Sequence, residues 1–343
     1  MRVLLSVSTL VLVSAALAFA QPAAPVLDIY HVDVEGGAAT LIVTPARESV
    51  LVDAGWPGND GRDVERIQAA MKAAGISRID HFITSHYHTD HAGGLPPLLA
   101  AVPIGAFHDH GTMTPPYAKD FASSYEAYTA VVKTRSTVEP GATLTLRAAG
   151  GAVPVTLAFV AANGAVTGAT GPANPACAGA PAKPDDPSDN ARSVAFVLSY
   201  GVFDFFDAGD LTWNTEAKLA CPDTKVPVVD VYQVTHHGLD TSNNPVLLQA
   251  LAPTVAVMNN GARKGGSAAT VHALKALPSL QALYQLHRNV ATGPADNTAP
   301  ELIANPDETP DDGHMVSVHV QPDGRYEVVN HRTGARRGFT SKK

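Results

Sequence analysis

Six consecutive residues constrain this chain more than any other feature. Residues 86–91, with the sequence His-Tyr-His-Thr-Asp-His, follow directly on the largely apolar run 79–84. Because side chains alternate in an extended segment, the first two histidines and the aspartate can face one side, and a turn then brings the last histidine to join them. The pattern predicts a metal site; a polar loop that happens to be rich in histidine is the weaker interpretation. The metal-competent residues are His86, His88, Asp90 and His91.

The donor types restrict the metal. Imidazole nitrogen and carboxylate oxygen without thiolate suit Zn²⁺, with Mn²⁺ or Fe²⁺ as alternatives. A site that the protein coordinates incompletely activates water, whereas a closed site only stabilises the fold. Since one segment with groups on two sides can serve two ions, we expect two zinc ions.

Two later apolar strands end in residues of the same kinds. The strand 202–207 leads into Asp210, which suits a carboxylate shared between two cations, although a turn aspartate is the alternative. The strand 228–234 leads into His236 and His237. Adjacent residues of a strand point in opposite directions, so we expect one ligand here and favour His236, with His237 as its alternative or as a supporting or substrate contact.

Asp53 closes the strand 49–53, just before Ala54 and Gly55. A carboxylate at a strand end can accept the free N–H of a ligand imidazole and so fix the orientation of the ring. We expect this supporting role for Asp53.

These motifs, in this order, resemble the metallo-β-lactamase superfamily. Two further details are similar to the metallohydrolase domain of bacterial competence (DNA-uptake) channel proteins: Asp-Val-Glu-Gly-Gly-Ala at 33–38, and His-His-Gly at 236–238 with Ser242 nearby. The resemblance covers roughly residues 26–260. It implies an α/β fold, the four-layer αββα sandwich of two mixed sheets flanked by helices, with a binuclear site at one edge.

The resemblance also implies a division of ligands. His86 and His88 would hold one ion and Asp210 both, with Asp90 and Asp210 as the catalytic carboxylates that carry metal and align the nucleophile. The other ion would be held by Asp90, His91 and His236.

One position departs from the superfamily pattern. Most members have a histidine before the strand that precedes the bridging aspartate, where this chain has Asn190. The first ion would then have fewer imidazoles, a water, or a ligand from His108 or His110. His110 also follows a strand, so it is a candidate ligand or substrate contact.

The loop 259–266 combines glycines with two cationic residues. Its backbone amides and Lys264 could receive an anionic substrate group, and Asn260 could supply a further contact. A solvated glycine-rich loop is the alternative interpretation.

The N-terminus resembles a secretory signal. Arg2 precedes an apolar stretch, and small residues precede Gln21, so we expect residues 1–20 to be removed, with an uncleaved anchor as the alternative. The protein should be periplasmic or secreted, with no membrane segment after cleavage. Cys177 and Cys221, which lie in proline-flanked loops, should form a disulfide in that oxidising compartment.

The net charge of the chain limits its expected partners, and its length limits the expected number of domains. Without Arg2 the chain has 23 basic residues against 32 acidic ones, a formal net charge of −9. Such a surface does not attract polyanions, so we expect a small or short oligomeric substrate and no stable nucleic-acid binding. About 320 residues fit one domain, 21–343, with an irregular loop at 168–190 and a C-terminal hairpin at 314–332. The sequence does not indicate the oligomeric state.

Three functional classes follow. The first is metal-dependent hydrolysis, of a phosphodiester or another small anion, or alternatively of an acyl substrate such as a β-lactam, a lactone or a thioester. The second is mononuclear iron redox chemistry, and the third is metal binding without catalysis. Fold alone does not choose among them.

Overall fold

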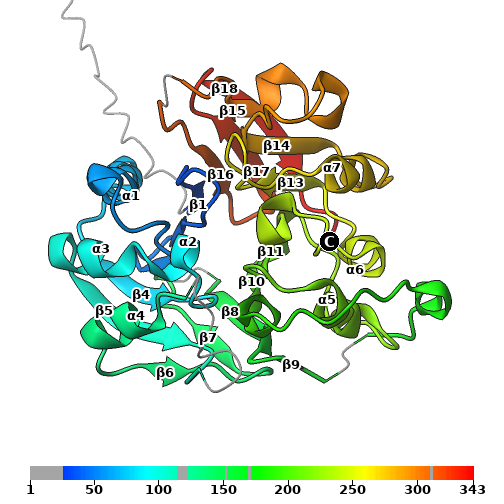
Figure 1. The fold of residues 1–343 in the computed structure, drawn as a ribbon, viewed down its shortest axis with the longest axis horizontal. Coiled ribbons are helices and arrows are strands. Elements are labelled where there is room, and N and C mark those ends of the chain that lie inside the picture. Colours follow the sequence, from blue (N-terminus) through cyan, green and yellow to red (C-terminus); the bar gives the residue numbers. More distant parts are fainter. Residues whose placement is uncertain (1–25, 114–122, 151–152, 169–170, 310–311) are drawn as a thin grey trace, which may run out of the picture.

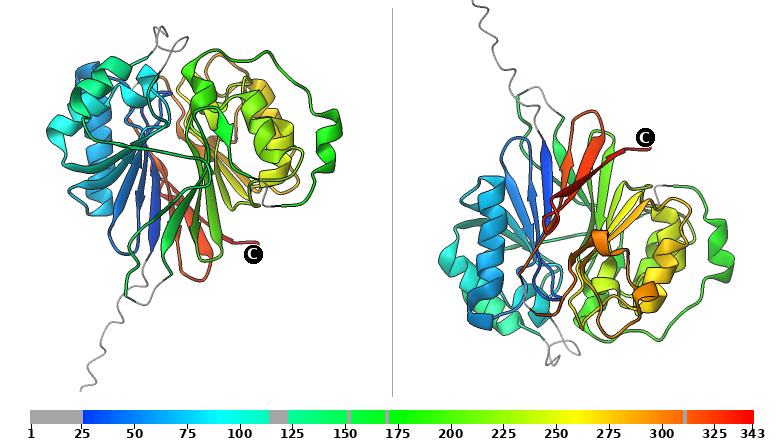
Figure 2. Two further views of the ribbon diagram at one scale, coloured as in Figure 1. Left: turned by 90° about the horizontal axis from the view of Figure 1, so that it is seen from below. Right: turned by 90° about the horizontal axis from the view of Figure 1, so that it is seen from above.

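The predicted four-layer αββα architecture is confirmed. A computed structural model describes residues 26–113, 123–150, 153–168, 171–309 and 312–343. Two nine-stranded sheets lie face to face in the middle of the molecule, and helices cover the outer face of each (Figures 1 and 2). The predicted signal peptide, residues 1–20, lies outside the described residues, and the single domain 21–343 stays a prediction.

The helices divide between the two outer layers. In chain order they are α1 (Arg62–Ala74), α2 (Thr89–Ala92), α3 (Leu95–Ala101), α4 (Tyr125–Val131), α5 (Trp213–Ala220), α6 (Pro245–Leu251) and α7 (Ala268–Lys275). The first four cover one sheet and the last three cover the other (Figure 2).

The first sheet has the strand order β18-β17-β16-β1-β2-β3-β4-β5-β6. Its strands are β1 (Leu27–His31), β2 (Thr40–Val43), β3 (Ser49–Val52), β4 (Ile79–Ile83), β5 (Ile104–Asp109), β6 (Ser136–Thr137), β16 (Val316–Val320), β17 (Arg325–Asn330) and β18 (Ala335–Thr340). The pairs from β3 to β6 are parallel, so the carboxyl ends of these strands meet at one edge.

The second sheet has the order β15-β14-β13-β12-β11-β10-β8-β7, with β9 paired to β8. Its strands are β7 (Thr143–Thr145), β8 (Val155–Ala162), β9 (Ala165–Val166), β10 (Ala195–Tyr200), β11 (Phe203–Asp207), β12 (Val231–Gln233), β13 (Val255–Met258), β14 (Ala282–His287) and β15 (Ile303–Asn305). The pairs from β11 to β15 are parallel. Both sheets therefore offer parallel strand ends for a site.

Alternation along the strands separates three apolar layers. Phe203 and Phe205 of β11 belong to the core between the two sheets, whereas Phe206 packs in the layer under α5, α6 and α7. In β3, Val50 and Val52 face the central core, and Leu51 faces the layer under the helices of the first sheet. Period-two patterning thus buries both faces of each sheet.

Some elements differ from those expected. The predicted C-terminal hairpin forms from β16 and β17, but β18, which the sequence reasoning missed, pairs with β17 and forms the edge of the sheet. Helix α7 was also missed, although Ser267 caps it by accepting a hydrogen bond from the Thr270 N–H. No helix in the described part of the chain is long and apolar enough to cross a membrane.

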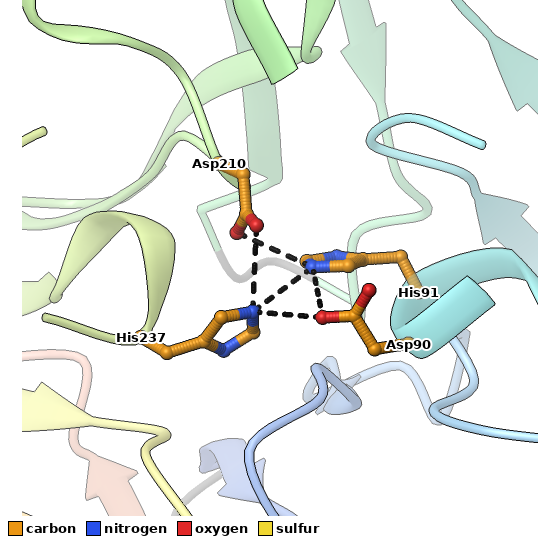
Figure 3. A group of neighbouring side chains, drawn as sticks. All are labelled: Asp90, His91, Asp210 and His237. Atoms are coloured by element: carbon orange, nitrogen blue, oxygen red, sulfur yellow. Dashed lines mark hydrogen bonds and ion pairs between the residues drawn. The ribbon is translucent and has the colours of Figure 1, made fainter. Parts of the chain in front are cut away.

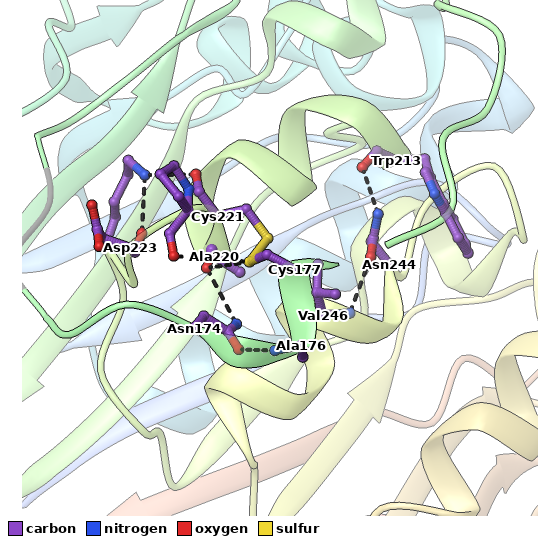
Figure 4. The surroundings of a disulfide bond; sticks show 11 residues. Asn174, Ala176, Cys177, Trp213, Ala220, Cys221, Asp223, Asn244 and Val246 are labelled. Atoms are coloured by element: carbon purple, nitrogen blue, oxygen red, sulfur yellow. Dashed lines mark hydrogen bonds between the residues drawn. A yellow bond between two sulfur atoms is a disulfide. The ribbon is translucent and has the colours of Figure 1, made fainter. Parts of the chain in front are cut away.

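A disulfide joins Cys177 to Cys221, as predicted (Figure 4). Cys177 lies in a short 3-10 turn, Pro175–Gly179, within the predicted irregular loop, of which the structure describes residues 168 and 171–190. Cys221 directly follows α5, and the Asn174 side chain donates to the Ala220 carbonyl beside it. The bond therefore ties the irregular loop to the end of a helix.

A buried ion pair bridges the two sheets near their shared edge. Asp33 follows β1, His287 ends β14, and the His287 Nε2 lies 2.8 Å from the Asp33 Oδ1. Burial works to lower the pKa of His287, but hydrogen bonds to Asp33 and Glu35 outweigh it and raise the pKa to about 9. The imidazolium form is therefore favoured in the folded protein at neutral pH.

This pair predicts a pH-dependent stability. The raised pKa of His287 contributes about 3 kcal/mol below the unfolded value near 6.5, and this contribution is lost as pH rises through about 9. We expect His287→Asn to lower the free energy of unfolding most at pH 6 and progressively less towards pH 10, as measured by urea denaturation. The exposed His272→Asn variant is the control, and a His287→Asn deficit that stays constant over this range would contradict the prediction.

Candidate metal centre

The metal-competent residues come from strand ends that the topology brings to one edge. The His-rich segment follows β4 and runs into α2, Asp210 follows β11, and His236 and His237 follow β12. Since β11 and β12 are parallel neighbours, their carboxyl ends lie side by side in the second sheet. In open α/β sheets, sites form outside such strand ends.

Four buried side chains form a tight cluster, which we name the Asp90 cluster: Asp90, His91, Asp210 and His237 (Figure 3). One ligand atom from each lies within 4.8 Å of the others. The His237 Nε2 lies 3.1 Å from the Asp90 Oδ2, and the His91 Nε2 lies 3.2 Å from the Asp210 Oδ1. Two nitrogens and two carboxylates in this arrangement fit a divalent cation such as Zn²⁺.

His86 and His88 lie next to this cluster. The His86 ring centroid is 4.2 Å from that of His91 and 4.7 Å from that of His88. The His86 Nε2 lies 4.0 Å from the Asp210 Oδ2 and is a buried nitrogen without a hydrogen-bond partner among the described residues. Buried polar atoms are rarely left unsatisfied, so this nitrogen fits a ligand role. Asp210 therefore lies near the His86 imidazole as well as near the imidazoles of the Asp90 cluster.

The structure differs from the expected assignment at the adjacent histidines. His237, and not His236, joins Asp90 and His91 in the Asp90 cluster. The reasoning from strand alternation failed because these residues are not in a strand: His236 and His237 have φ values of 55° and 53°, in the left-handed region. Both imidazoles can then lie near Asp210, as their Nε2 atoms do, each 3.4 Å from its Oδ2.

Asp53 lies behind His91. The His91 Nδ1 lies 2.7 Å from the Asp53 Oδ2, and Ser85 donates both its N–H and its hydroxyl to the same carboxylate. This contact fixes the His91 ring and directs its other nitrogen into the Asp90 cluster. The Ser85 contribution was missed by sequence reasoning, although its position just before the His-rich segment was a signal.

His110 has another partner. Its Nε2 lies 3.1 Å from the Asp189 Oδ2, and its ring packs against Tyr87 with centroids 4.6 Å apart. His108 pairs with His81, their ring nitrogens 3.2 Å apart. The structure thus pairs these two candidate ligands with Asp189 and His81. The Asn190 Nδ2 lies 3.4 Å from the His236 Nε2.

The two predicted substrate contacts, Lys264 and Asn260, have different surroundings. The Lys264 ammonium contacts the Asp90 carboxylate and lies 4.9 Å from the centroid of the Trp56 ring. Asn260 is fully buried and donates to the carbonyls of Gly261 and His287, at 3.0 and 2.7 Å. Its amide is used to hold the loop, so the expectation that Asn260 contacts substrate is not supported. Trp56 was missed by sequence reasoning.

A glycine allows the loop that follows β1 to pack closely against the backbone of Asp90. Gly37 follows the Asp33-Val34-Glu35 segment, and a Cβ there would lie 2.4 Å from the Asp90 carbonyl oxygen. The neighbouring Ala38 N–H donates to that same carbonyl at 3.1 Å. A side chain at this position would push the Asp90 backbone away, so glycine is required for this packing.

The electrostatics favour a cation here. Burial works to raise the pKa of Asp90, but the charge of His91 and a hydrogen bond from His237 outweigh it, so the pKa is well below its usual value. Burial lowers the pKa of His86, and the nearby His91 and His88 lower it further. Burial works to lower the pKa of His91, but the charges of Asp210, Asp90 and Asp53 outweigh it and hold the pKa well above its usual value, so a metal ion bound by His91 would replace a proton that these carboxylates favour.

Comparisons with known proteins agree with this fold. Residues 32–168 match the family model of the metallo-beta-lactamase superfamily, which agrees with the resemblance drawn from the motifs over that part of the chain. Recombination protein 2 from Haemophilus influenzae is 26% identical over 247 residues, which cover 71% of this chain and 26% of that protein. An atrochrysone carboxyl ACP thioesterase from Pseudocercospora fijiensis is 36% identical over 67 residues, 20% of this chain and 19% of the relative. The matches thus span about a quarter or less of these relatives.

Similar solved structures include a motif mutant of a metallo-beta-lactamase from Cronobacter sakazakii. It is 19% identical, with a TM-score of 0.37, and the match covers 60% of this chain and 75% of that one. The diiron beta-hydroxylase CmlA from Streptomyces venezuelae is 14% identical, with a TM-score of 0.38, over 68% of this chain and 44% of that one. These likenesses concern the fold alone.

Proposed function

Because this chain is a metallo-beta-lactamase-fold protein with a candidate metal site, we propose that it is a binuclear metal-dependent hydrolase. The observation that carries the proposal is the convergence of Asp90, His91, Asp210 and His237 from three separate segments into one buried group. Burying four such groups together is costly unless a cation compensates them. The family model supports a metal-dependent enzyme, and the two-ion hydrolytic site is the finer proposal.

The protein groups have distinct tasks in this proposal. Asp90, His91, Asp210 and His237 would hold one ion, and His86 and His88, with Asp210 shared, would hold the other. When bound, the ions lower the pKa of a coordinated water and stabilise charge developing on the substrate. Asp53 fixes the His91 ring, and Asp210 sets the spacing of the two groups. Lys264 places a positive charge beside Asp90 that can attract an anionic substrate.

We propose a small phosphodiester, or another small anion, as the substrate. Lys264 at the centre supports an anionic group, and the net charge of −9 expected without residues 1–20 disfavours a long polyanion. The match to Recombination protein 2 is compatible with a phosphodiester substrate but spans only a quarter of that protein. We also propose export, which the disulfide supports.

Acyl hydrolysis is the second candidate, because one relative, matched over 67 residues, is named a thioesterase. In acyl hydrolysis the Asn260 side chain could donate a hydrogen bond to the oxyanion. The structure argues against this role, because that side chain donates to two backbone carbonyls instead. The neighbouring amide, Asn259, would then be the oxyanion donor.

A substrate panel tests the proposal. We expect protein reconstituted with Zn²⁺ or Mn²⁺ to hydrolyse a chromogenic phosphodiester faster than a chromogenic cephalosporin, an acyl-homoserine lactone or an acyl thioester, because in the phosphodiester the anionic group that Lys264 attracts is also the group that is attacked. His88→Ala should lose this activity by at least about a hundredfold, since imidazole ligands hold the ion. The exposed His272→Ala is the matched control. Activity on the acyl substrates alone would overturn the phosphodiester assignment, and an iron-dependent redox signal with no hydrolysis would overturn the hydrolase.

A further inference from the structure

We infer that His236 completes the first ion site, taking the place of the histidine that this chain lacks at Asn190. The inference rests on the proposed two-ion function and assigns to the adjacent histidines one ion each: His236 to the site of His86 and His88, and His237 to the Asp90 cluster. The resemblance to the superfamily does not provide this ligand, because the usual residue is replaced.

The left-handed turn separates the two imidazoles. His236 and His237 both have positive φ, and their ring centroids lie 6.2 Å apart with the planes at 66°. The Nε2 atoms of both approach the Asp210 Oδ2 at 3.4 Å, but the His237 Nε2 also lies 3.1 Å from the Asp90 Oδ2, whereas the His236 Nε2 lies 3.4 Å from the Asn190 Nδ2. Both rings therefore meet the same Asp210 oxygen, which also lies 4.0 Å from the His86 Nε2, but their other contacts differ, with Asp90 beside His237 and Asn190 beside His236.

Hydrogen bonds fix which His236 nitrogen is available. The Ser242 hydroxyl donates to the Leu211 carbonyl at 2.7 Å, so its single hydrogen is used there. The Ser242 Oγ, 3.0 Å from the His236 Nδ1, must then accept the Nδ1 hydrogen. Thr241 Oγ1 lies 3.1 Å from the same nitrogen. The Nε2 of neutral His236 consequently carries a lone pair, which is the form that ligates a metal.

The contact with Asn190 agrees with this tautomer. An amide Nδ2 is only a donor, so at 3.4 Å from the His236 Nε2 it faces an acceptor nitrogen. Asn190 stands where the superfamily histidine would stand, and its side chain meets the imidazole that we assign to its role. His108 and His110, the other candidates for this role, have His81 and Asp189 as partners.

The backbone holds His236 rigidly at this point. Its N–H donates to the Gly209 carbonyl at 2.9 Å, which joins the His-His turn to the segment carrying Asp210. Gly238 ends the turn with φ of 79°, and a Cβ there would lie 2.6 Å from the Met258 sulfur. The turn thus keeps the distance between His236 and Asp210 fixed.

Metal stoichiometry tests the inference without any assay of activity. We measure Zn²⁺ by elemental analysis after equilibrium dialysis, with folding checked by circular dichroism. Wild-type protein should hold two equivalents. His236→Ala should hold one, with binding of the second ion weakened by at least about a hundredfold, because even losing a hydrogen-bond partner of a ligand costs about 10–100-fold. The double variant N190H/H236A should regain the second equivalent.

Two further variants keep the test decisive. N190H alone should change the affinity of either ion less than threefold, about 0.65 kcal/mol, because His236 already fills the position. His272→Ala should behave as wild type. A folded His236→Ala protein that keeps two equivalents would overturn the inference, as would a large gain in affinity from N190H in the wild-type background. A wild-type protein that binds no ion would instead overturn the proposed function.

Discussion

Asp210→Ala is expected to abolish binding of both ions and to reduce hydrolysis by at least about a thousandfold, because one carboxylate serves both groups of imidazoles and metal-based charge stabilisation is worth several kcal/mol. The Asp210 Oδ2 lies 4.0 Å from the His86 Nε2 and 3.4 Å from the Nε2 of His237. Elemental analysis and initial rates on the chromogenic phosphodiester would measure the two effects.

The control for this variant is Asp240→Ala, which removes an exposed carboxylate from the loop after the His-His turn. Its metal content and rate should match those of the wild type. An Asp210→Ala protein that is folded and still holds two ions would contradict the assignment of Asp210 as the shared ligand, whatever its activity.

Removing the disulfide should have the largest effect on stability. The Cys177–Cys221 bond closes a loop with a sequence separation of 44 residues, and the loop-closure relation gives about 4 kcal/mol for a loop of this length. We therefore expect C177S/C221S to lower the free energy of unfolding by about that amount. Urea denaturation of the wild-type and double-serine proteins measures the difference.

The reduced wild-type protein provides the comparison. If the loss comes from the cross-link itself, reduction of the wild type and the double substitution should destabilise the protein to a similar extent. Equal stability of the oxidised wild type and the double-serine variant would contradict the prediction. It would mean that hydrogen bonds, such as that from the Asn174 side chain to the Ala220 carbonyl, are enough to hold the irregular loop.

Most strands and helices were predictable because their sequence patterns are strong, whereas the four-layer arrangement was predicted from the resemblance to the metallo-β-lactamase superfamily. Apolar runs with β-branched residues marked the central strands, and Gly75, with φ of 67°, ends α1 where a terminator was expected. The elements that were missed lack such patterns. Helix α7 is only eight residues long, and β18 contains two arginines and a glycine among mostly exposed residues.

The candidate site was predictable in composition but not in every contact. The clustering of imidazoles and carboxylates after strands predicted Asp90, His91 and Asp210 as candidates, and the structure brings these three side chains together. The choice between His236 and His237 required the backbone conformation, since a left-handed turn removes the alternation on which the sequence argument depended. The positions of His110 and Asn260 depended on distant partners, Asp189 and the His287 carbonyl, that no local pattern reveals.

The metal content of the purified wild-type chain tests the central claim most directly. The protein is dialysed against trace Zn²⁺ or Mn²⁺ and the bound metal is counted against the protein concentration. Two equivalents per chain are predicted, removed by a chelator and restored by added metal. A folded protein that binds no divalent ion under these conditions would contradict the account.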